Sequence, residues 1–224
     1  PLLARGGGTS QCGQTVNNAI VIDNSKYLNK VLDFNKEKMT CIVEPGIVLD
    51  ELNRFLKPYG LWFPVDVSTS SRATIGGMAG NNSCGGRSIR YGMMRDNVID
   101  IEAILYDGSI YNFGNINSYH IDSSNSSANE IIKKLQELAE TNKKEILSKF
   151  PKVLRRVGGY NIDALLPDAM ANRPNGKVGD GINLSHLLVG SEGTLAYSTA
   201  ITLKLSPLPS KKIMGVCHFP SFYE

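Results

Sequence analysis

Three stretches rich in glycine, serine, threonine and asparagine hold most of the residues in this chain that could bind an anion. They are residues 5–13, 66–86 and 190–196. Glycine allows the backbone to approach another group closely, so several main-chain N–H groups can converge on one anion. The second stretch has five glycines within residues 74–86, together with Ile75, Met78 and Cys84, which are unusual in a solvated linker. We therefore expect a buried loop around a flat or anionic ligand.

The first stretch places three adjacent glycines, Gly6 to Gly8, before Thr9 and Ser10. Main-chain donors and hydroxyls in this order suit a phosphate-binding loop. No Lys follows as in a Walker A loop, and the third glycine of the G-x-G-x-x-G pattern is missing. Taken alone, this stretch leaves a plain surface turn open as the alternative.

Residues for acid–base, metal or nucleophilic chemistry are scattered. The histidines are far apart: His120, His186 and His218. The cysteines form no C-x-x-C pair and predict free thiols in a reducing compartment: Cys12, Cys41, Cys84 and Cys217. No metal site is expected. Glu192 could act as a general base, but a lone acid without a neighbouring His is weak support, and a turn kept for its backbone shape is favoured.

The composition of the chain limits the classes of function that it can have. The chain has 224 residues, 42% of them hydrophobic, and a net charge of +3 with dispersed basic residues, which does not favour nucleic-acid binding. No apolar run approaches the roughly 20 residues of a membrane span. No signal peptide is visible, so we expect a cytoplasmic protein, with peripheral attachment to the inner face of the membrane left open. The ends at Pro1 and Glu224 suggest a segment of a longer protein.

Hydrophobic patterns predict the elements that would position these stretches. Strands are expected at 1–4, buried, and at 19–23, 196–205 and 212–219, with a hairpin at 30–35 and 39–44. A second hairpin joins 98–107 to 109–113 through a type I′ turn at Asp107-Gly108. Helices are expected at 47–59, ended by Gly60, and at 128–150.

The order and spacing of three motifs resemble the FAD-binding domain of the FAD-linked oxidases. The motifs are Arg5-Gly6-Gly7-Gly8-Thr9-Ser10, the 66–71 stretch with Thr74-Ile75-Gly76-Gly77, and Gly190-Ser191-Glu192-Gly193-Thr194-Leu195. The domain is the PCMH type, like that of vanillyl-alcohol oxidase. The branch that looks most similar contains D-lactate dehydrogenase, the glycolate oxidase FAD subunit and D-2-hydroxyglutarate dehydrogenase. Residues 85–92 and 154–161 look like long bacterial members that join an FAD half to an iron–sulfur half.

The resemblance implies a non-covalent FAD site, because Thr9 stands where some relatives carry the His that links the flavin. Residues 5–11 would cradle the pyrophosphate with backbone N–H groups, and 66–72 would line the flavin and ribityl side. Residues 74–78 would run close under the diphosphate and the isoalloxazine, and 81–85 would continue that wall. Residues 192–198 would lie along the adenine-proximal or flavin-edge strand by backbone contact. The implied cofactor contacts are Arg5, Gly6, Gly7, Gly8, Thr9, Ser10, Gln11, Asp66, Ser68, Ser70, Ser71, Thr74, Ile75, Gly76, Gly77, Asn81, Ser83, Gly85, Glu192, Gly193, Thr194, Leu195 and Ala196. Ala196 replaces a glycine usual in the family.

The implied fold is α+β, a PCMH-type FAD-binding domain of two α/β lobes with FAD between them. The first, small lobe would span 1–62 and be incomplete at its N-terminus. The larger lobe, 63–210, would be a mainly antiparallel sheet flanked by helices. Residues 211–224 would begin the substrate domain, which would hold the catalytic residues.

The implied function is FAD binding within an oxidoreductase. The full protein would oxidise a D-2-hydroxy acid such as D-lactate, glycolate or D-2-hydroxyglutarate by hydride transfer to flavin N5. An electron acceptor, with an iron–sulfur domain left open, would be the further partner. Contacts to a carboxylate or phosphate are considered for three arginines, with surface solvation favoured for at least two of them: Arg87, Arg90 and Arg95.

Three alternatives stay open. One is a phosphate- or nucleotide-binding module without redox activity, and another is a remnant that binds nothing. The third is the flavin reductase of cell-wall precursor synthesis, which shares this type of domain but is disfavoured by the 66–71 and 190–194 stretches.

Overall fold

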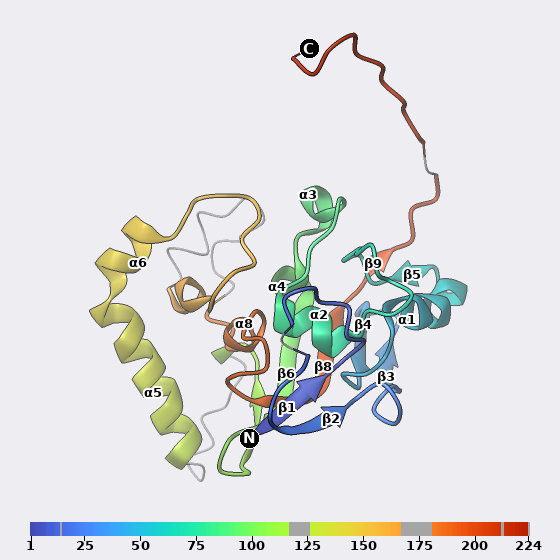
Figure 1. Cartoon of the computed structure of the whole chain (residues 1–224). Helices are drawn as coiled ribbons and strands as arrows, with labels where there is room; N and C mark the ends of the chain where they lie inside the picture. Colours follow the sequence, from blue (N-terminus) through green and yellow to red (C-terminus); the bar gives the residue numbers. More distant parts are fainter. Residues whose placement is uncertain (14, 117–125, 167–180, 212, 224) are drawn as a thin grey trace.

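A five-stranded antiparallel sheet forms the centre of the molecule in the computed structural model, which describes residues 1–13, 15–116, 126–166, 181–211 and 213–223. The strand order is β3-β4-β8-β6-β7 (Figure 1). The strands span Val31–Asn35 (β3), Thr40–Val43 (β4), Val98–Ile104 (β6), Ile110–Phe113 (β7) and Tyr197–Lys204 (β8). The predicted α+β class with a mainly antiparallel sheet is confirmed.

The sheet forms because β8 is rich in β-branched residues and alternates in burial along its second half. Ile201 and Leu203 are fully buried, and Val43 of β4 and Ile101 of β6 are buried beside them. β8 pairs with β4 on one side and β6 on the other, so its main-chain groups find partners on both edges. The predicted strand at 196–205 is confirmed.

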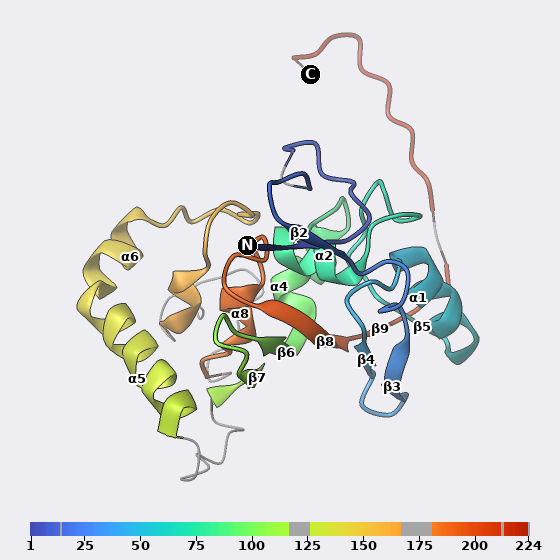
Figure 2. The ribbon, with the colours of Figure 1, turned by 60° about the horizontal axis from the view of Figure 1, so that its bottom comes forward.

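Helices flank the sheet. Two lie next to β6 and β8: α2 (Ile75–Asn81) and α8 (Ser185–Leu188). In Figures 1 and 2, α1 (Leu49–Leu56) lies on the β3–β4 side of the molecule, whereas α5 (Ser126–Thr141) and α6 (Lys143–Lys149) lie on the opposite side. The short helices are η1 (Lys57–Tyr59), α3 (Ser88–Tyr91), α4 (Met94–Asn97) and η3 (Ile162–Leu165).

The predicted helix 47–59 is confirmed as α1 continued by η1. Leu49, Leu52 and Leu56 point into the core at helical spacing. Gly60 ends the segment with φ of 73°, a conformation that glycine adopts without the clash of a Cβ atom.

Two small sheets complete the fold. β1 (Leu2–Arg5) pairs in parallel with β2 (Ile20–Asp23), and β5 (Leu61–Trp62) pairs with β9 (Ser206–Pro207). The expected strands at 1–4 and 19–23 are confirmed, but the first is not buried: Leu2 is 68% exposed. An apolar run of four residues indicated burial, whereas the structure leaves one face of β1–β2 uncovered.

The predicted hairpin at 30–44 is β3–β4, and β4 also pairs with β8. The hairpin, expected in the first lobe 1–62, therefore belongs to the same hydrogen-bonded sheet as strands from the expected larger lobe. The division into 1–62, 63–210 and 211–224 stays a prediction.

Local geometry corrects four further expectations. The helix expected at 128–150 is two helices, because the chain breaks at Asn142, whose amide donates to the Leu138 carbonyl (2.8 Å). The turn between β6 and β7 is not type I′, since only Gly108 of the pair has a positive φ. Residues 213–219 form no strand, and residues 74–86 are not one loop because they contain α2.

No helix within the described part of the chain has both the length and the apolar character needed to cross a membrane.

Candidate functional site

A cavity of about 750 Å³ lies where the three glycine-rich stretches meet. This volume falls within the roughly 300–1,000 Å³ typical of small-molecule sites. Its walls come from the loop after β1, from the 66–69 and 83–86 segments, from α2 and from the 190–193 turn. The structure thus brings together segments from the two ends of the chain, from Gly6 to Gly193, which is the arrangement that the sequence predicted for these stretches.

The loop of residues 6–11 is positioned by the strand before it and by its glycines. β1 is fixed to β2, and the Asn24 N–H donates to the Arg5 carbonyl (3.0 Å) just before the loop. A Cβ atom on Gly6 would overlap Thr74 Oγ1, and one on Gly7 would overlap the Arg72 carbonyl. Only glycine therefore lets the loop lie directly on the segment that precedes α2.

The same loop presents main-chain donors. Among the described residues, the N–H groups of Gly6, Gly7, Gly8 and Thr9 have no hydrogen-bond partner. Successive free N–H groups in a turn form a concave site for anions. Within the part of the chain that the structure describes, no Lys or Arg lines the cavity, and the charged lining residues are Asp66 and Glu192. An anionic ligand would therefore be held by backbone dipoles.

The first N–H groups of helix α2, unlike those of the loop, donate to acceptors within the protein. Ile75 donates to the Ile47 carbonyl (2.9 Å) and Gly76 to the Pro45 carbonyl (2.7 Å). Gly77 donates to the Oγ1 of Thr74, which caps the helix (3.3 Å). The donors expected from the 74–78 stretch are consequently used inside the protein.

The glycines of α2 serve close packing instead. A Cβ on Gly76 would lie 2.5 Å from Pro45 Cβ, so this glycine lets the helix pack against Pro45. A Cβ on Gly77 would meet only Thr74 Oγ1, at 3.2 Å, and Gly77 lines the cavity. The backbone of α2 at Gly77 is therefore directly accessible from the cavity.

The 190–193 turn closes the other end of α2. The Gly190 N–H donates to the Ala79 carbonyl and the Glu192 N–H to the Gly80 carbonyl, each at 2.9 Å. Glu192 has a positive φ of 52°, and its carboxylate accepts from Asn81 Nδ2 (3.1 Å). These contacts agree with the interpretation that the turn is present for its backbone shape.

Asp66 fixes a further wall. Its Oδ1 accepts from the Arg87 N–H (3.1 Å), and its Oδ2 lies 3.9 Å from Arg87 Nε. A Cβ on Gly85 would overlap the Asp66 carbonyl, so the 85–87 segment lies against Asp66 only because residue 85 is glycine. The pairing leaves Asp66 partly neutralised beside the cavity.

Most of the predicted contact residues line the cavity. They are Gly6, Gly7, Gly8, Thr9, Ser10, Gln11, Asp66, Ser68, Thr74, Gly76, Gly77, Asn81, Ser83, Gly85, Glu192, Gly193 and Ala196. Six others are not among its lining residues: Arg5, Ser70, Ser71, Ile75, Thr194 and Leu195.

The structure gives reasons for several of these six. The Arg5 side chain pairs with Asp23 (3.2 Å), and Ile75 is fully buried in the core. The Thr194 hydroxyl donates to the Ser191 carbonyl (2.6 Å), which stabilises the turn. These residues support the walls of the cavity.

Sequence reasoning missed part of the lining, including Leu3, Ala4, Thr15, Asn24, Pro45, Val157 and Leu188. Asn24 reaches the site because β2 runs parallel to β1 and ends beside the loop. Val157 lies in the 154–161 stretch, which was noted for its resemblance but was given no role in the site. The positions of these residues depend on tertiary contacts that no local pattern records.

The titratable residues outside the cavity are mostly structural. Burial lowers the pKa of His186 to about 3, with the Arg95 charge as a second cause, so this imidazole is neutral. Burial raises the pKa of the Cys41 thiol to about 12.

Arg95, one of the three arginines that could contact an anion or be solvated at the surface, is 4% exposed and donates to Asn161 (2.7 Å). Within the described residues, no three His, Cys, Asp or Glu side chains are grouped to hold a metal ion. His120 lies outside the described residues, and His218 is exposed.

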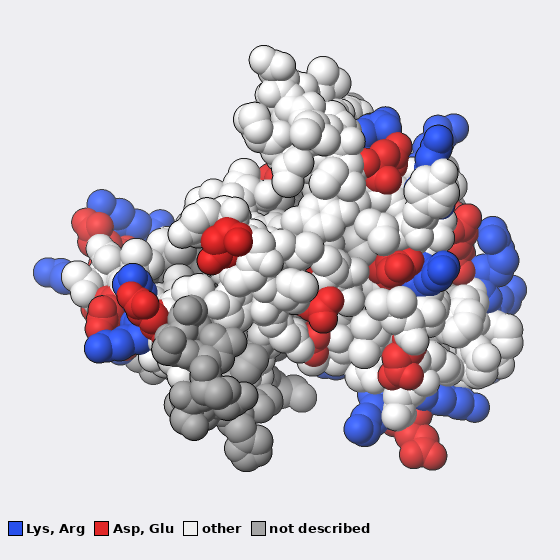
Figure 3. Space-filling view, turned by 90° about the horizontal axis from the view of Figure 1, so that it is seen from below, with Lys and Arg blue, Asp and Glu red and all other residues white. Residues whose placement is uncertain are grey.

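Charged side chains lie mainly at the edges of the face shown in Figure 3. Basic and acidic residues are interspersed on the α5–α6 side and on the α1 and β3–β4 side. Few charged side chains are visible at the centre of this face among the residues that the structure describes.

Comparisons with known proteins agree with this arrangement. The family described as "FAD binding domain" matches residues 1–114, about half of the chain. D-2-hydroxyglutarate dehydrogenase of Escherichia coli (strain K12) is 32% identical over 221 residues, which are 97% of this chain and 21% of that protein. The mitochondrial cytochrome D-lactate dehydrogenase of Arabidopsis thaliana is 30% identical over 99% of this chain and 29% of its own. Glycolate oxidase subunit GlcD of Bacillus subtilis (strain 168) is 28% identical over 95% of this chain and 33% of that protein.

Among solved structures, alkyldihydroxyacetonephosphate synthase superposes with a TM-score of 0.58 at 21% identity, over 94% of this chain and 28% of that one. This similarity supports the fold alone. The chain spans about a fifth of the length of the D-2-hydroxyglutarate dehydrogenases that it matches.

Proposed function

Because this chain belongs to the FAD-binding-domain family of the FAD-linked oxidases, we propose that it is the FAD-binding segment of a flavin-dependent oxidoreductase. The resemblance inferred from the three motifs is confirmed, and so is FAD as the cofactor of the family. The whole protein would oxidise a D-2-hydroxy acid. This substrate class is supported by the relatives named for D-2-hydroxyglutarate, D-lactate and glycolate.

One observation carries the proposal: main-chain donors from Gly6 to Thr9 with no partner among the described residues open onto a cavity of about 750 Å³, and the described lining of this cavity contains no Lys or Arg. A diphosphate needs several donors at close range and no bulky side chains, and converging N–H groups supply them. The residues present fit FAD in this respect.

The proposed division of the site follows from the donors. The loop 6–11 would hold the pyrophosphate, because its N–H groups are the free ones. The α2 surface at Gly77 would lie along the cofactor, because Gly77 lines the cavity and a Cβ there would meet only Thr74 Oγ1. The 83–86 segment and the 190–193 turn would enclose the remainder. Thr9, in place of a histidine, supports non-covalent binding.

When bound, FAD would supply the hydride acceptor, while these residues bind it, orient it and exclude water. Substrate ligands and the catalytic base would lie in the rest of the protein. An electron acceptor, an iron–sulfur domain and a cytoplasmic location belong to this proposal. The names of the relatives support only the class of substrate-processing flavoenzyme.

The test is a flavin titration. We predict that the purified chain binds FAD, read by the flavin absorption spectrum and by quenching of flavin fluorescence. Gly77→Val should fold and bind FAD about 100-fold more weakly, because two methyl groups would enter the cavity and overpacking costs about 1–3 kcal/mol.

The matched control is Gly215→Val, since a Cβ there meets no atom within 4 Å. Equal FAD affinity of the Gly77→Val and Gly215→Val variants would contradict the proposed site. ADP binding without flavin binding by the wild type would instead support the nucleotide-binding module without redox activity.

A further inference from the structure

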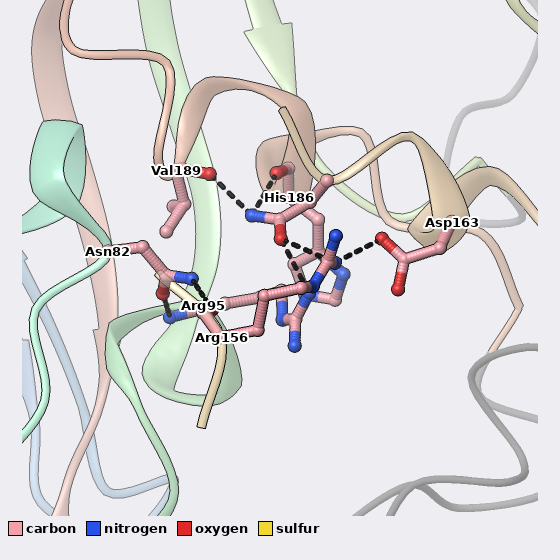
Figure 4. Close-up of polar contacts among 7 residues, drawn as sticks. Asn82, Arg95, Arg156, Asp163, His186 and Val189 are labelled. Atoms are coloured by element: carbon pink, nitrogen blue, oxygen red, sulfur yellow. Dashed lines mark hydrogen bonds and ion pairs between the residues drawn. The ribbon is translucent and has the colours of Figure 1, made fainter. Parts of the chain in front are cut away.

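A buried asparagine lies behind the 190–193 turn. Asn161 is 2% exposed and uses all four of its hydrogen-bonding positions. Its Oδ1 accepts from Arg95 Nη1 (2.7 Å) and Arg156 Nη2 (3.1 Å). Its Nδ2 donates to the carbonyls of His186 (3.2 Å) and Val189 (2.7 Å). Figure 4 labels the partners on both sides of this amide: Arg95 and Arg156 on one side, His186 and Val189 on the other.

The oxygen side of the amide faces a fixed frame. Arg156 also pairs with buried Asp163, and the Arg156 carbonyl accepts from Asn82 Nδ2 (3.3 Å). Asn82 is the residue that ends α2, with a positive φ of 53°, and its Oδ1 accepts from the Arg95 N–H (3.1 Å). The frame therefore connects Asn161 to the C-terminus of α2.

The nitrogen side of the amide holds the end of α8. The last carbonyls of a helix have no partner within it, and a helix of only four residues depends on outside donors. Asn161 supplies both N–H groups, to residues on either side of cavity-lining Leu188. Gly190 follows immediately, and its φ of +91° turns the chain toward α2.

The path from the amide to the cavity is short. A Cβ on Gly190 would lie 3.3 Å from Asn161 Nδ2, so the amide and the turn are in contact. The N–H groups of Gly190 and Glu192 then bond to the last carbonyls of α2, and Ser191, Glu192 and Gly193 line the cavity. A shift of the Asn161 amide would move this wall.

We propose that Asn161 is a positioning residue for the flavin: it sets the place of the 190–193 turn through the carbonyls of His186 and Val189. The flavin as ligand rests on the proposed function. The role of Asn161 in positioning the 190–193 turn does not depend on it. Asn161 lies behind the cavity wall and is not among the residues that line it.

The informative variant is Asn161→Asp. A carboxylate would still accept from both guanidinium groups. Its charge would lie beside two cations, Arg95 and Arg156, which also interact with the carboxylates of Asp96 and Asp163. The two N–H donors to α8 would be lost and replaced by repulsion between oxygens. The fold is therefore retained on the arginine side, and only the link to the turn is broken.

The matched control is Asn97→Asp. Asn97 is also buried, at 4% exposure, and its Nδ2 also donates to two carbonyls, those of Tyr91 (2.8 Å) and Met93 (2.9 Å). Those residues do not line the cavity. The control thus repeats the chemical change without the connection to the 190–193 turn.

Three measurements are made at a temperature where all variants are folded. In Asn161→Asp, the amides of Gly190 and Glu192 should exchange hydrogen at least about 10-fold faster than in the wild type, since loss of one hydrogen bond of ordinary strength corresponds to about that factor. FAD affinity should fall about 10-fold, and the visible circular dichroism of the bound flavin should change. Asn97→Asp should leave all three readouts at wild-type values.

The outcomes separate the two ideas. Unchanged exchange of the turn amides, or equal effects of Asn161→Asp and Asn97→Asp, overturn the positioning role. Faster exchange with no FAD binding by the wild type supports the structural role but refutes the proposed cofactor. If either Asp variant fails to fold, the pair Asn161→Ser and Asn97→Ser, which adds no buried charge, is read in the same way.

Discussion

Residues 6–11 and helix α2 both line the cavity and both are rich in glycine, but their main-chain N–H groups differ. In the loop, those of Gly6 to Thr9 have no partner among the described residues. In the helix, the N–H groups of Ile75, Gly76 and Gly77 bond to Ile47, Pro45 and Thr74. The loop side (β1, β2 and residues 6–11) is half-exposed, whereas the helix side (α2, α8 and the 190–193 turn) is largely buried.

The difference shows that a glycine-rich stretch can serve two purposes. In the loop, missing side chains let the chain lie on residues 72–74 while donors stay free for a ligand. In α2, they let two pieces of protein backbone approach each other. The helix side is therefore a rigid wall, and the loop side is the part that is completed by a ligand.

The largest expected effect is on the helix side. Gly76→Ala should destabilise the chain by about 3 kcal/mol, because the new Cβ would lie 2.5 Å from Pro45 Cβ and the Gly76–Pro45 hydrogen bond prevents the helix from retreating. Urea unfolding followed by fluorescence of Trp62, the single tryptophan, measures this. The neighbouring Gly77→Ala is the control and should cost less than about 1 kcal/mol. Equal losses of stability in Gly76→Ala and Gly77→Ala would contradict the distinction between a glycine packed against Pro45 and a glycine facing the cavity.

On the loop side, the same chemical change should act on binding. Gly7→Ala places a Cβ onto the Arg72 carbonyl, so the loop must lift away from residues 72–74. Stability should fall by only about 1 kcal/mol, because the N–H groups of the loop hold no protein partner, whereas FAD affinity should fall about 100-fold. Titration with FAD and urea unfolding give the two numbers, and Gly158→Ala, with no atom within 4 Å of its Cβ, is the reference. A stability loss as large as that of Gly76→Ala would contradict the comparison.

The smallest effect is the response to acid. The pKa of His186 on the helix side is lowered from 6.5 to about 3 by burial, so between these values the unfolded chain binds a proton that the folded chain does not. Stability therefore falls as the pH falls, by about 2 kcal/mol between pH 7 and pH 5 from this residue. In His186→Gln, the loss between these pH values should be smaller by that amount.

The loop side offers the control for pH. Hydrogen bonds from Ser25 hold the pKa of Asp23 below its ordinary 3.8, so its contribution to stability is lost only below that value. Asp23→Asn should leave the difference between pH 7 and pH 5 unchanged. If Asp23→Asn reduces the loss of stability between pH 7 and pH 5 and His186→Gln does not, the assignment of this loss to His186 is wrong.

Local patterns were sufficient for much of the fold. Both hairpins, the α1 helix ended by Gly60, and the strands β1, β2 and β8 agree with the predictions. Each is specified by neighbours in sequence: alternation, helical spacing or a glycine stop. The miss at α2 has a partly tertiary cause, since Thr74 caps the helix locally but Pro45 and Ile47, from another segment, accept its first N–H groups. The break at Asn142 and the turn at Gly108 are local features.

By itself, the sequence determined the family, the cofactor class and which three stretches would meet, because the order of the glycine motifs and their small side chains carries that information locally. Only the tertiary structure decided which N–H groups remain free for a ligand, since that depends on whether another segment accepts them. It also showed that Asn161, an ordinary residue in the sequence, connects α2 to α8. Burial of an amide between two guanidinium groups and two carbonyls arises only when distant segments are brought together.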